Sequence, residues 1–318
     1  MLSQAQLSQF EEDGFLVVED LLDRELDVEP VVAEYEALLD DLCAGWVDQG
    51  RLKSACAELP FEQRLVKVYQ AGCQYTQPLD IALPGGEIRA DTPIHLGPAV
   101  FNMMRSPRLL DAVESFIGPE IYSNPIQHVR IKPPLRLVDE GDQANSMLAK
   151  TFWHQDQGVT MPEADDTNMI TAWVAISDAT AENGCLQVIP GSQHGGMVTH
   201  CPGKQTGIPD HLINEELARP VPVRGGGVIF FHPRTKHGSL NNLSDSFRWS
   251  FDLRYNPIGQ PTGRPFFPGF VARSRAHPES ELRDVKAWAD SWYAARELLT
   301  IAGSVTLHRW DANAPVCA

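Results

Sequence analysis

The chain has 318 residues, of which 43% are hydrophobic and 21% are charged, a composition that excludes an intrinsically disordered protein. Its formal net charge is −16, and a surface of this sign repels nucleic acid and anionic membranes. We therefore expect neither as a partner, and the charge also counts against a polyanionic substrate unless local Lys and Arg residues form a patch.

The length allows one large domain or two of ordinary size, and we expect a single domain over residues 1–318. Within it we distinguish a helical N-terminal portion of about residues 1–118, a β-rich core of about 121–257, and a C-terminal helical extension of about 279–301. The predicted helices have one function, which is to cover one face of a sheet.

The N-terminal portion contains capping and periodicity signals. Ser3 can cap a short helix that ends at Asp13, before a predicted strand over residues 15–18. Hydrophobic residues at helical spacing predict further helices over about 27–47 and 99–117, the second divided at Ser106-Pro107. Residues 51–95 are rich in Pro and Gly and are expected to be mostly loop.

From residue 121 onward, short β-rich runs alternate with turn residues. The candidate strands are 126–132, 152–154, 170–177, 185–189, 228–232 and 247–255. Strands of this length and spacing predict a mainly β protein with a double-stranded β-helix (jelly-roll, cupin-like) core. Two polar loops, Val138 to Ser146 and His194 to Pro222, are long enough to act as lids.

The C-terminal helix, about residues 279–301, carries Trp288 and Trp292 one turn apart. We expect them to pack on the core or on a second subunit, which leaves a homodimer open. The six cysteines form no C-x-x-C pair, so we expect free thiols. With no signal peptide and no apolar run of membrane-spanning length, a cytoplasmic location is expected.

The tripeptide His154-Gln155-Asp156 is the most informative pattern in the chain. A His and an Asp two residues apart at a strand end can bind one metal ion, and His237 offers a third ligand downstream. Two imidazoles and one carboxylate on one face of an octahedral ferrous ion leave positions open, an arrangement used for oxygen activation.

Arg248 follows His237 by eleven residues, in a run where polar and apolar side chains alternate as in a strand with two different faces. A guanidinium matches a carboxylate with two parallel hydrogen bonds. Arg248 could therefore bind the far carboxylate of 2-oxoglutarate while its keto-acid end chelates the iron. Ser250, Asp252 and Arg254 should point to the same side as Arg248.

These patterns together resemble the phytanoyl-CoA dioxygenase family of Fe(II)/2-oxoglutarate-dependent oxygenases. The resemblance covers most of the chain, from about Leu7 to Tyr255. It is carried by the motifs Ile131-Lys132-Pro133-Pro134, Trp153-His154-Gln155-Asp156, Ala172-Trp173-Val174-Ala175, Asn183-Gly184-Cys185-Leu186-Gln187-Val188-Ile189-Pro190-Gly191-Ser192 and His237-Gly238-Ser239, followed by Arg248.

The resemblance implies Fe(II), 2-oxoglutarate and O2 as cofactor and cosubstrates. It implies iron ligands and cosubstrate contacts at His154, Asp156, His237, Arg248, Ser239, Lys132 and Trp173. Arg248 and Ser239 would hold the distal carboxylate, whereas Lys132 could instead be a solvated strand end and Trp173 a core aromatic. Related halogenases replace the carboxylate ligand with a small residue, so Asp156 disfavours halogenation.

Substrate contacts are expected at His128 and Arg130, which share a strand face with Lys132, and at Gln157 and Arg254. These basic groups favour a small polar or acidic metabolite, with hydroxylation of an aliphatic C–H as the default reaction. Two alternatives stay open. One is a metal-dependent oxygenase of the same fold that does not use 2-oxoglutarate, and the other is a non-catalytic cupin-like binding protein.

Overall fold

The structure is a computed structural model that describes residues 1–73, 76–305, 307 and 309–317. Its described strands form three sheets in which every pairing is antiparallel. The large sheet has the order β1 (Phe15–Val18), β7 (Val228–Phe231), β4 (Ile170–Ala175), β9 (Arg248–Pro257), β3 (Glu120–Lys132) and β10 (Phe270–Ser274). The small sheet has the order β6 (Arg219–Val221), β5 (Leu186–Val188) and β8 (His237–Ser239), and the third pairs β11 (Ser304–Val305) with β2 (Gly86–Glu87).

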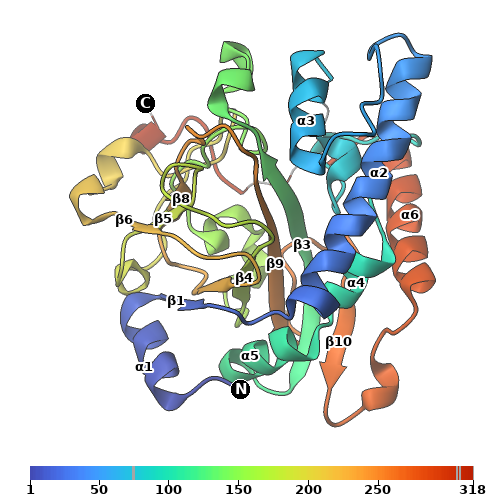
Figure 1. Cartoon of the computed structure of the whole chain (residues 1–318). Coiled ribbons are helices and arrows are strands. Elements are labelled where there is room, and N and C mark those ends of the chain that lie inside the picture. The colour runs from blue at the N-terminus through green and yellow to red at the C-terminus, as the bar shows by residue number, and fades with distance from the viewer. Residues whose placement is uncertain (74–75, 306, 308, 318) are drawn as a thin grey trace.

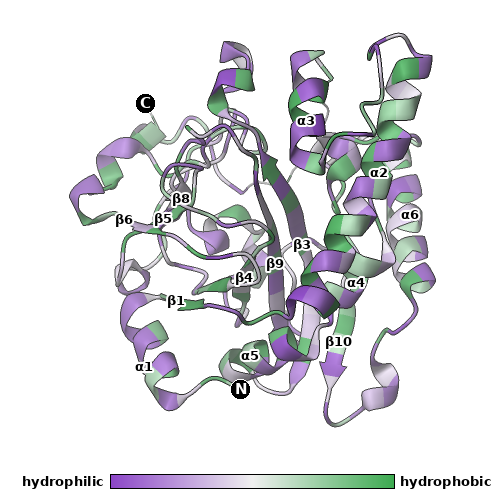
Figure 2. Ribbon diagram, in the orientation of Figure 1, coloured by the Kyte–Doolittle hydropathy of each residue, from purple (hydrophilic) through white to green (hydrophobic). Residues whose placement is uncertain are grey.

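Helices cover one face of the large sheet, and the small sheet lies on the other side (Figure 1). The helices are α1 (Gln4–Asp13), α2 (Glu29–Asp48), α3 (Phe61–Gln70), α4 (Pro98–Met104), α5 (Pro107–Ile117) and α6 (Val285–Ala302). In Figure 2, hydrophobic and hydrophilic positions alternate around α2, as expected for a helix that buries one side. The mainly antiparallel sheet with flanking helices agrees with the predicted fold class at this level.

Side chains of β9 point alternately to the two faces of the sheet, and this decides which of them contact the helices. Phe251, Leu253 and Tyr255 belong to the large core between the sheet and the helices. The intervening side chains of β9 face the small sheet, across a second core that contains Trp173 and Phe231. Because successive strand residues point to opposite faces, the same ten residues of β9 serve both layers.

The N-terminal helix predictions are largely confirmed. Ser3 and Gln6 form a capping box, and Gly14 ends α1 with a positive φ of 77°. The chain divides α4 from α5 at Ser106, as predicted. The prediction of mostly loop over residues 51–95 is wrong for α3. Its buried Phe61, Leu65 and Val68 have helical spacing that the surrounding Pro and Gly residues obscure.

One strand prediction needs correction, and the structure decides between the two alternatives for the C-terminal tryptophans. Residues 152–154 form no strand, because only His154 pairs, in an isolated bridge with His237. Trp288 and Trp292 are 1% and 0% exposed and pack on Phe101 and Phe267 of the same chain. They are therefore core residues rather than a subunit contact. Among the described residues, no helix is both long and apolar enough to cross a membrane.

Candidate metal centre

A backbone pairing brings the two candidate histidine ligands together. His154 and His237 exchange both backbone hydrogen bonds, each at 2.9 Å, in an antiparallel bridge. Directly opposed residues of an antiparallel pair point to the same face, so the two imidazoles lie side by side, with ring centroids 4.2 Å apart. The pairing of the strands therefore joins two residues that are far apart in the sequence.

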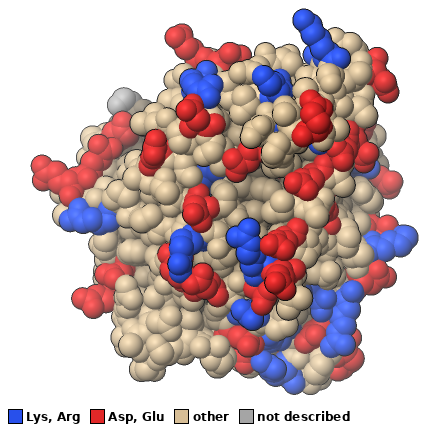
Figure 3. Space-filling model, viewed as in Figure 1, with Lys and Arg blue, Asp and Glu red and all other residues tan. Residues whose placement is uncertain are grey.

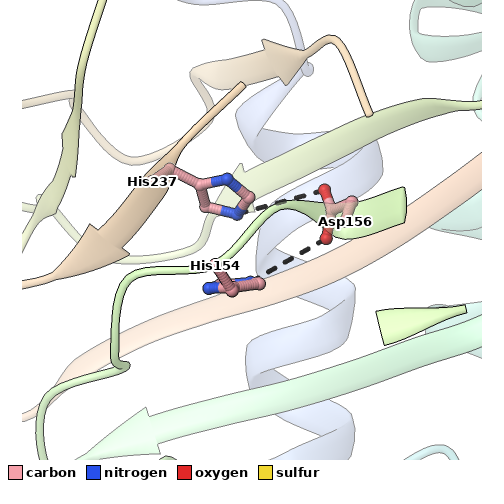
Figure 4. A group of neighbouring side chains, drawn as sticks. All are labelled: His154, Asp156 and His237. Atoms are coloured by element: carbon pink, nitrogen blue, oxygen red, sulfur yellow. Dashed lines mark ion pairs between the residues drawn. The ribbon is translucent and has the colours of Figure 1, made fainter. Parts of the chain in front are cut away.

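Asp156 completes the group from the first turn of a short 3-10 helix, Asp156–Val159. Its Oδ1 lies 3.9 Å from Nε2 of His154, and its Oδ2 lies 4.0 Å from Nε2 of His237 (Figure 4). The potential ligand atoms of the three residues all lie within 4.8 Å of one another. Two neutral imidazoles and one carboxylate at this spacing fit a single divalent iron ion.

Each histidine is held in the orientation that a metal requires. Nδ1 of His154 lies 2.9 Å from the carbonyl of Phe152, and Nδ1 of His237 lies 3.0 Å from the carbonyl of Thr235. A carbonyl can only accept, so Nδ1 carries the proton and Nε2 presents its lone pair. Burial, together with the neighbouring His237, lowers the pKa of His154 to about 3, so that His154 is neutral at physiological pH.

Asp156 is fully buried and is held by two donors. Thr171 donates to Oδ2 at 2.6 Å, and the Arg254 guanidinium donates to Oδ1. Although burial by itself raises the pKa of this carboxyl, Arg254 and then the two histidines bring it below its usual range. The group is therefore an anionic ligand at any physiological pH.

The loop between His154 and Asp156 is fixed by residues that the sequence patterns did not single out. Gln155 is fully buried, and its amide donates to the carbonyls of Gly196 and Arg234. Its backbone N–H donates to Nε2 of the buried His200 at 2.9 Å. No spacing or periodicity links His200 to the tripeptide, because the contact depends on how the 194–222 loop folds back.

Arg248 lies in a narrow cavity beside this centre, on β9 and fully buried. Its Nη1 donates to Ser250 at 2.6 Å, but its Nε and Nη2 are buried without a hydrogen-bond partner in the described part of the chain. The indole Nε1 of Trp173, whose ring lies 5.1 Å from the guanidinium, is likewise unpartnered. Buried donors of this kind are costly unless a ligand binds them, so the residues fit a carboxylate such as that of 2-oxoglutarate.

Lys132 and Ser239 form a hydrogen-bonded pair next to this cavity. The Lys132 ammonium is fully buried and donates to Ser239 at 2.6 Å and to Thr151 at 3.1 Å. Burial, and then repulsion by Arg248, lower the pKa of Lys132 well below its usual range. Lys132 is therefore not the solvated strand end that the sequence left open.

Comparisons with known proteins agree with this centre. The family model for phytanoyl-CoA dioxygenase (PhyH) matches residues 10–250. The chain belongs to this family. It is therefore a non-haem iron, 2-oxoglutarate-dependent oxygenase, and the ferrous ion, 2-oxoglutarate and O2 expected from the sequence are those of its family.

Individual relatives are distant. L-Proline trans-4-hydroxylase of Streptomyces griseoviridis is 28% identical over 197 residues, covering 55% of this chain and 69% of that protein. Ectoine dioxygenase of Bordetella parapertussis is 25% identical over 284 residues, covering 83% and 78%. Human peroxisomal phytanoyl-CoA dioxygenase is 29% identical over 164 residues, covering 49% and 45%.

The fold itself has a counterpart among solved structures. The apo form of the non-haem monooxygenase ThoJ matches 93% of this chain and 97% of its own, with a TM-score of 0.59 at 19% identity. At this identity the likeness concerns the fold alone.

A second cavity of this oxygenase, about 190 Å³, opens toward His154. His128 and Arg130 line it, but each pairs with a carboxylate, Asp80 at 2.9 Å and Asp252 at 2.6 Å respectively. Arg254 lines both cavities. The structure therefore brings these three expected substrate-side residues to the metal centre.

Gln157 is a correction to the expected substrate contacts. Its side chain donates to the carbonyl of Asp165 at 2.7 Å and lines neither of the two cavities beside the metal centre. The 3-10 turn that begins at Asp156 rotates Gln157 away from the face that carries the ligands. The structure therefore does not bring Gln157 to either of these cavities.

The cysteine prediction is wrong for one pair, because Cys201 and Cys317 form a disulfide across 116 residues. The remaining four cysteines are free. The disulfide ties the C-terminal tail to the 194–222 loop, and Trp310 of the tail donates to the carbonyl of Gly158 at 2.6 Å. Cysteine spacing could not predict this bond, since it depends on the C-terminal tail folding back to the 194–222 loop.

Proposed function

We propose that this oxygenase hydroxylates an aliphatic C–H of a small polar or acidic metabolite, converting 2-oxoglutarate to succinate and CO2. The observation that carries the proposal is the group of two imidazoles and one anionic carboxylate, beside a cavity that His154 and His237 share with Arg248. Two N–H groups of Arg248 are buried there without a partner among the described residues. These groups come from three separate segments, namely the His154–Asp156 tripeptide, β8 and β9, and meet between the two sheets. A non-catalytic binding protein has no need for such a set.

His154, Asp156 and His237 would hold the iron, which together with 2-oxoglutarate supplies the oxidising power drawn from O2. The backbone carbonyls at Nδ1 keep both imidazoles in the ligating tautomer. Thr171 and Arg254 keep Asp156 ionised and fix its rotamer. The protein thus prepares the geometry before any ligand binds, which lowers the reorganisation needed during reaction.

Arg248 would bind the distal carboxylate of 2-oxoglutarate through its two unpartnered N–H groups. Trp173 offers a further donor and an apolar wall. Lys132 and Ser239, hydrogen-bonded to each other beside Arg248, would complete the polar end of this cavity. The surrounding second core, with Leu186 and Phe231, keeps water from the site.

The size of the second cavity favours a small substrate. At about 190 Å³ it is below the usual range for drug-sized ligands, which begins at roughly 300 Å³. Two relatives are named for proline and ectoine, which are small molecules. A complete CoA thioester would leave most of its bulk outside, against a surface rich in Asp and Glu on the face seen in Figure 3.

The same proposal covers the architecture of the domain, the location of the protein and its partners. We treat the six-stranded and three-stranded sheets as the two walls of a double-stranded β-helix, in a single domain over residues 1–318. A cytoplasmic location, the lack of a nucleic-acid partner and a homodimer stay predictions. The interspersed charges of Figure 3, without a broad basic patch on that face, support the second of these.

The test is uncoupled turnover by iron-loaded protein. With Fe(II), O2 and 2-oxoglutarate, the wild-type protein should release succinate, and His154→Ala should lose iron binding and succinate release together. His211→Ala alters an exposed histidine and is the matched control, which should behave as wild type. Iron binding and succinate formation at wild-type levels in His154→Ala would contradict the proposal.

A further inference from the structure

The second cavity, next to His154, is lined by a concentration of positive charge that is unexpected in so acidic a protein. Its basic lining residues are His128, Arg130, Lys204, Arg254 and Arg264, and none of the lining residues is Asp or Glu. The whole chain carries a formal charge of −16. The positive charge of the residues that line this cavity is therefore a local property, which the overall composition does not explain.

Arg264 differs from the other arginines of this cavity. It is 7% exposed, and it donates to two backbone carbonyls, those of Gly263 at 2.9 Å and Val159 at 2.5 Å. It has no ion pair with any described carboxylate, whereas Arg130 pairs with Asp252 and Arg254 with Asp156. Glu163 acts on Arg264 only at longer range. A buried guanidinium without a carboxylate in direct contact is costly, so an anion from outside the chain would stabilise it.

Arg254 adds a second buried donor to the same cavity. It is 6% exposed, and its Nε has no hydrogen-bond partner in the described part of the chain, although its other nitrogens contact Asp156 and Ile126. The two guanidiniums are near enough that Arg254 lowers the pKa of Arg264, after the larger effect of burial. Two cations held together in this way define a site for one anion.

Bound iron and 2-oxoglutarate would not neutralise this site. A ferrous ion and a 2-oxoglutarate dianion carry opposite and equal charges, so together they leave the balance unchanged. Three buried arginines, Arg248, Arg254 and Arg264, and the partly buried Arg130 then stand around the two cavities with the carboxylates of Asp156 and Asp252. A surplus of positive charge remains on the side where the substrate would bind.

We propose that Arg264, assisted by Arg254, binds an oxyanion group of the substrate, a carboxylate or a phosphate, and so places the rest of the substrate beside His154. This inference rests on the proposed function and specifies its substrate class. The planar fork of an arginine suits either oxyanion, because both offer paired acceptor oxygens. Arg264 thereby becomes a specificity residue outside the 10–250 region that the family model matches.

The test uses three small probes on protein loaded anaerobically with Fe(II) and 2-oxoglutarate. 2-Methylpropanoate and 2-methylpropanamide have nearly the same shape but differ in charge, and isopropyl phosphate presents the other oxyanion. By calorimetry, wild-type protein should bind at least one oxyanion about tenfold more tightly than the amide, as expected for charge-assisted hydrogen bonds. The better oxyanion identifies the group.

Variants assign this preference to Arg264. Arg264→Met should abolish most of the preference without changing the affinity for the amide, and Arg264→Lys should retain part of it. Arg219→Met is the matched control, because Arg219 also bonds backbone carbonyls but lies exposed and away from the site. Equal binding of the three probes to wild-type protein, or an unchanged preference in Arg264→Met, would overturn the inference.

2-Oxoglutarate binding separates this inference from the proposed function. It should be unchanged in Arg264→Met, and it is measured first in every variant. Its absence from wild-type protein would contradict the proposed function itself. If Arg264→Met does not fold, the preference for an oxyanion probe over the amide probe is compared between wild-type protein and Arg264→Lys. An equal preference in these two proteins would then contradict the inference.

Discussion

Among single side chains, Arg248 gives the clearest prediction. Arg248→Met keeps the length of the side chain but removes the two unpartnered donors, Nε and Nη2. Loss of charge-assisted hydrogen bonds to a carboxylate should weaken 2-oxoglutarate binding by about 10- to 100-fold. The dissociation constant is measured anaerobically on iron-loaded protein. Arg136→Met, which alters an exposed arginine, should have no effect.

The same variant separates the leading function from its nearest alternative. An oxygenase that does not use 2-oxoglutarate would show an unchanged response to this cosubstrate after Arg248→Met. Arg248→Lys adds a finer comparison, because it keeps the charge but loses the planar fork. Its affinity should fall between those of the wild type and the Met variant.

His200 leads to a prediction about pH. Burial lowers the pKa of His200 from its ordinary value of 6.5 to about 4, and its Nε2 accepts a hydrogen bond from Gln155. Between these pH values the unfolded chain binds a proton that the folded protein does not, so stability falls as the pH drops from 6.5 to 4. The contribution of His200 is up to about 3 kcal/mol.

His200→Gln should therefore flatten the pH dependence of the unfolding free energy in this range, as measured by urea denaturation of metal-free protein. Part of the slope will remain, because burial also lowers the pKa of His232 to about 4 and that of His154 to about 3. Exposed His211→Gln should leave the whole curve unchanged. A slope in His200→Gln equal to that of the wild type would show that His200 is not held neutral.

The residues of the centre were predictable to different degrees. His154, Asp156 and His237 stand in short motifs, and Arg248 follows at a fixed spacing in an alternating strand. Arg264 stands in an irregular Gly- and Pro-rich segment after β9, where no periodicity indicates which way a side chain points. Sequence patterns thus identify groups on regular elements, but not groups that loops bring to the same place.

At the scale of elements, the three-residue strand β8 determines whether the metal centre forms. A Cβ at Gly238 would lie 2.8 Å from the backbone oxygen of Thr151, so the two chain segments could not stay as close as they are. Gly238→Ala should separate His237 from His154, weaken iron binding and destabilise the protein by about 1–3 kcal/mol. Iron titration and chemical denaturation measure the two effects.

Gly45 provides the matched control for this substitution. It lies within α2, and a Cβ there would meet no heavy atom within 4 Å. Gly45→Ala should therefore stabilise the protein slightly, by about 0.5–1 kcal/mol, and leave iron binding unchanged. If both substitutions had the same effect, the close approach at Gly238 would not be what matters.

The elements also show why sequence reasoning failed where it did. The longest strands, β3 and β9, and the helices α1, α4 and α5 carry strong periodic or capping signals, and all were expected. β8 and β6 have only three residues each, too few to show alternation. They form because neighbouring strands pair with them, so their existence is a property of the assembled sheet.

At the scale of the whole molecule, the charge is divided between surface and interior. Acidic side chains are spread over the face shown in Figure 3, while three arginines, Arg248, Arg254 and Arg264, are buried around the two cavities. The negative potential of the surface disfavours large anions, whereas the buried arginines favour a small anion that can enter the cavities. The net charge alone therefore gave an incomplete indication of the substrate.

The Cys201–Cys317 disulfide links the C-terminal tail to the 194–222 loop, which gives the last prediction. The tail packs Trp310 on His200, with ring centroids 5.3 Å apart, and His200 in turn holds Gln155 between the two ligands of the tripeptide. Closing a loop of 116 residues should stabilise the fold by about 2–4 kcal/mol, chiefly by restricting the unfolded chain. Cys317→Ser should lose this amount and weaken iron binding.

Chemical denaturation with and without reductant measures the effect. Reduced wild-type protein should match Cys317→Ser, which itself should not respond to reductant. Cys56→Ser alters a free cysteine and should behave as wild type under both conditions. If reductant leaves the stability of wild-type protein unchanged, the tail is held by other contacts, such as the Trp310 hydrogen bond to Gly158 and the ion pair of Arg309 with Asp165. A fall in stability at unchanged iron affinity would instead mean that the tail stabilises the fold without acting on the ligand loop.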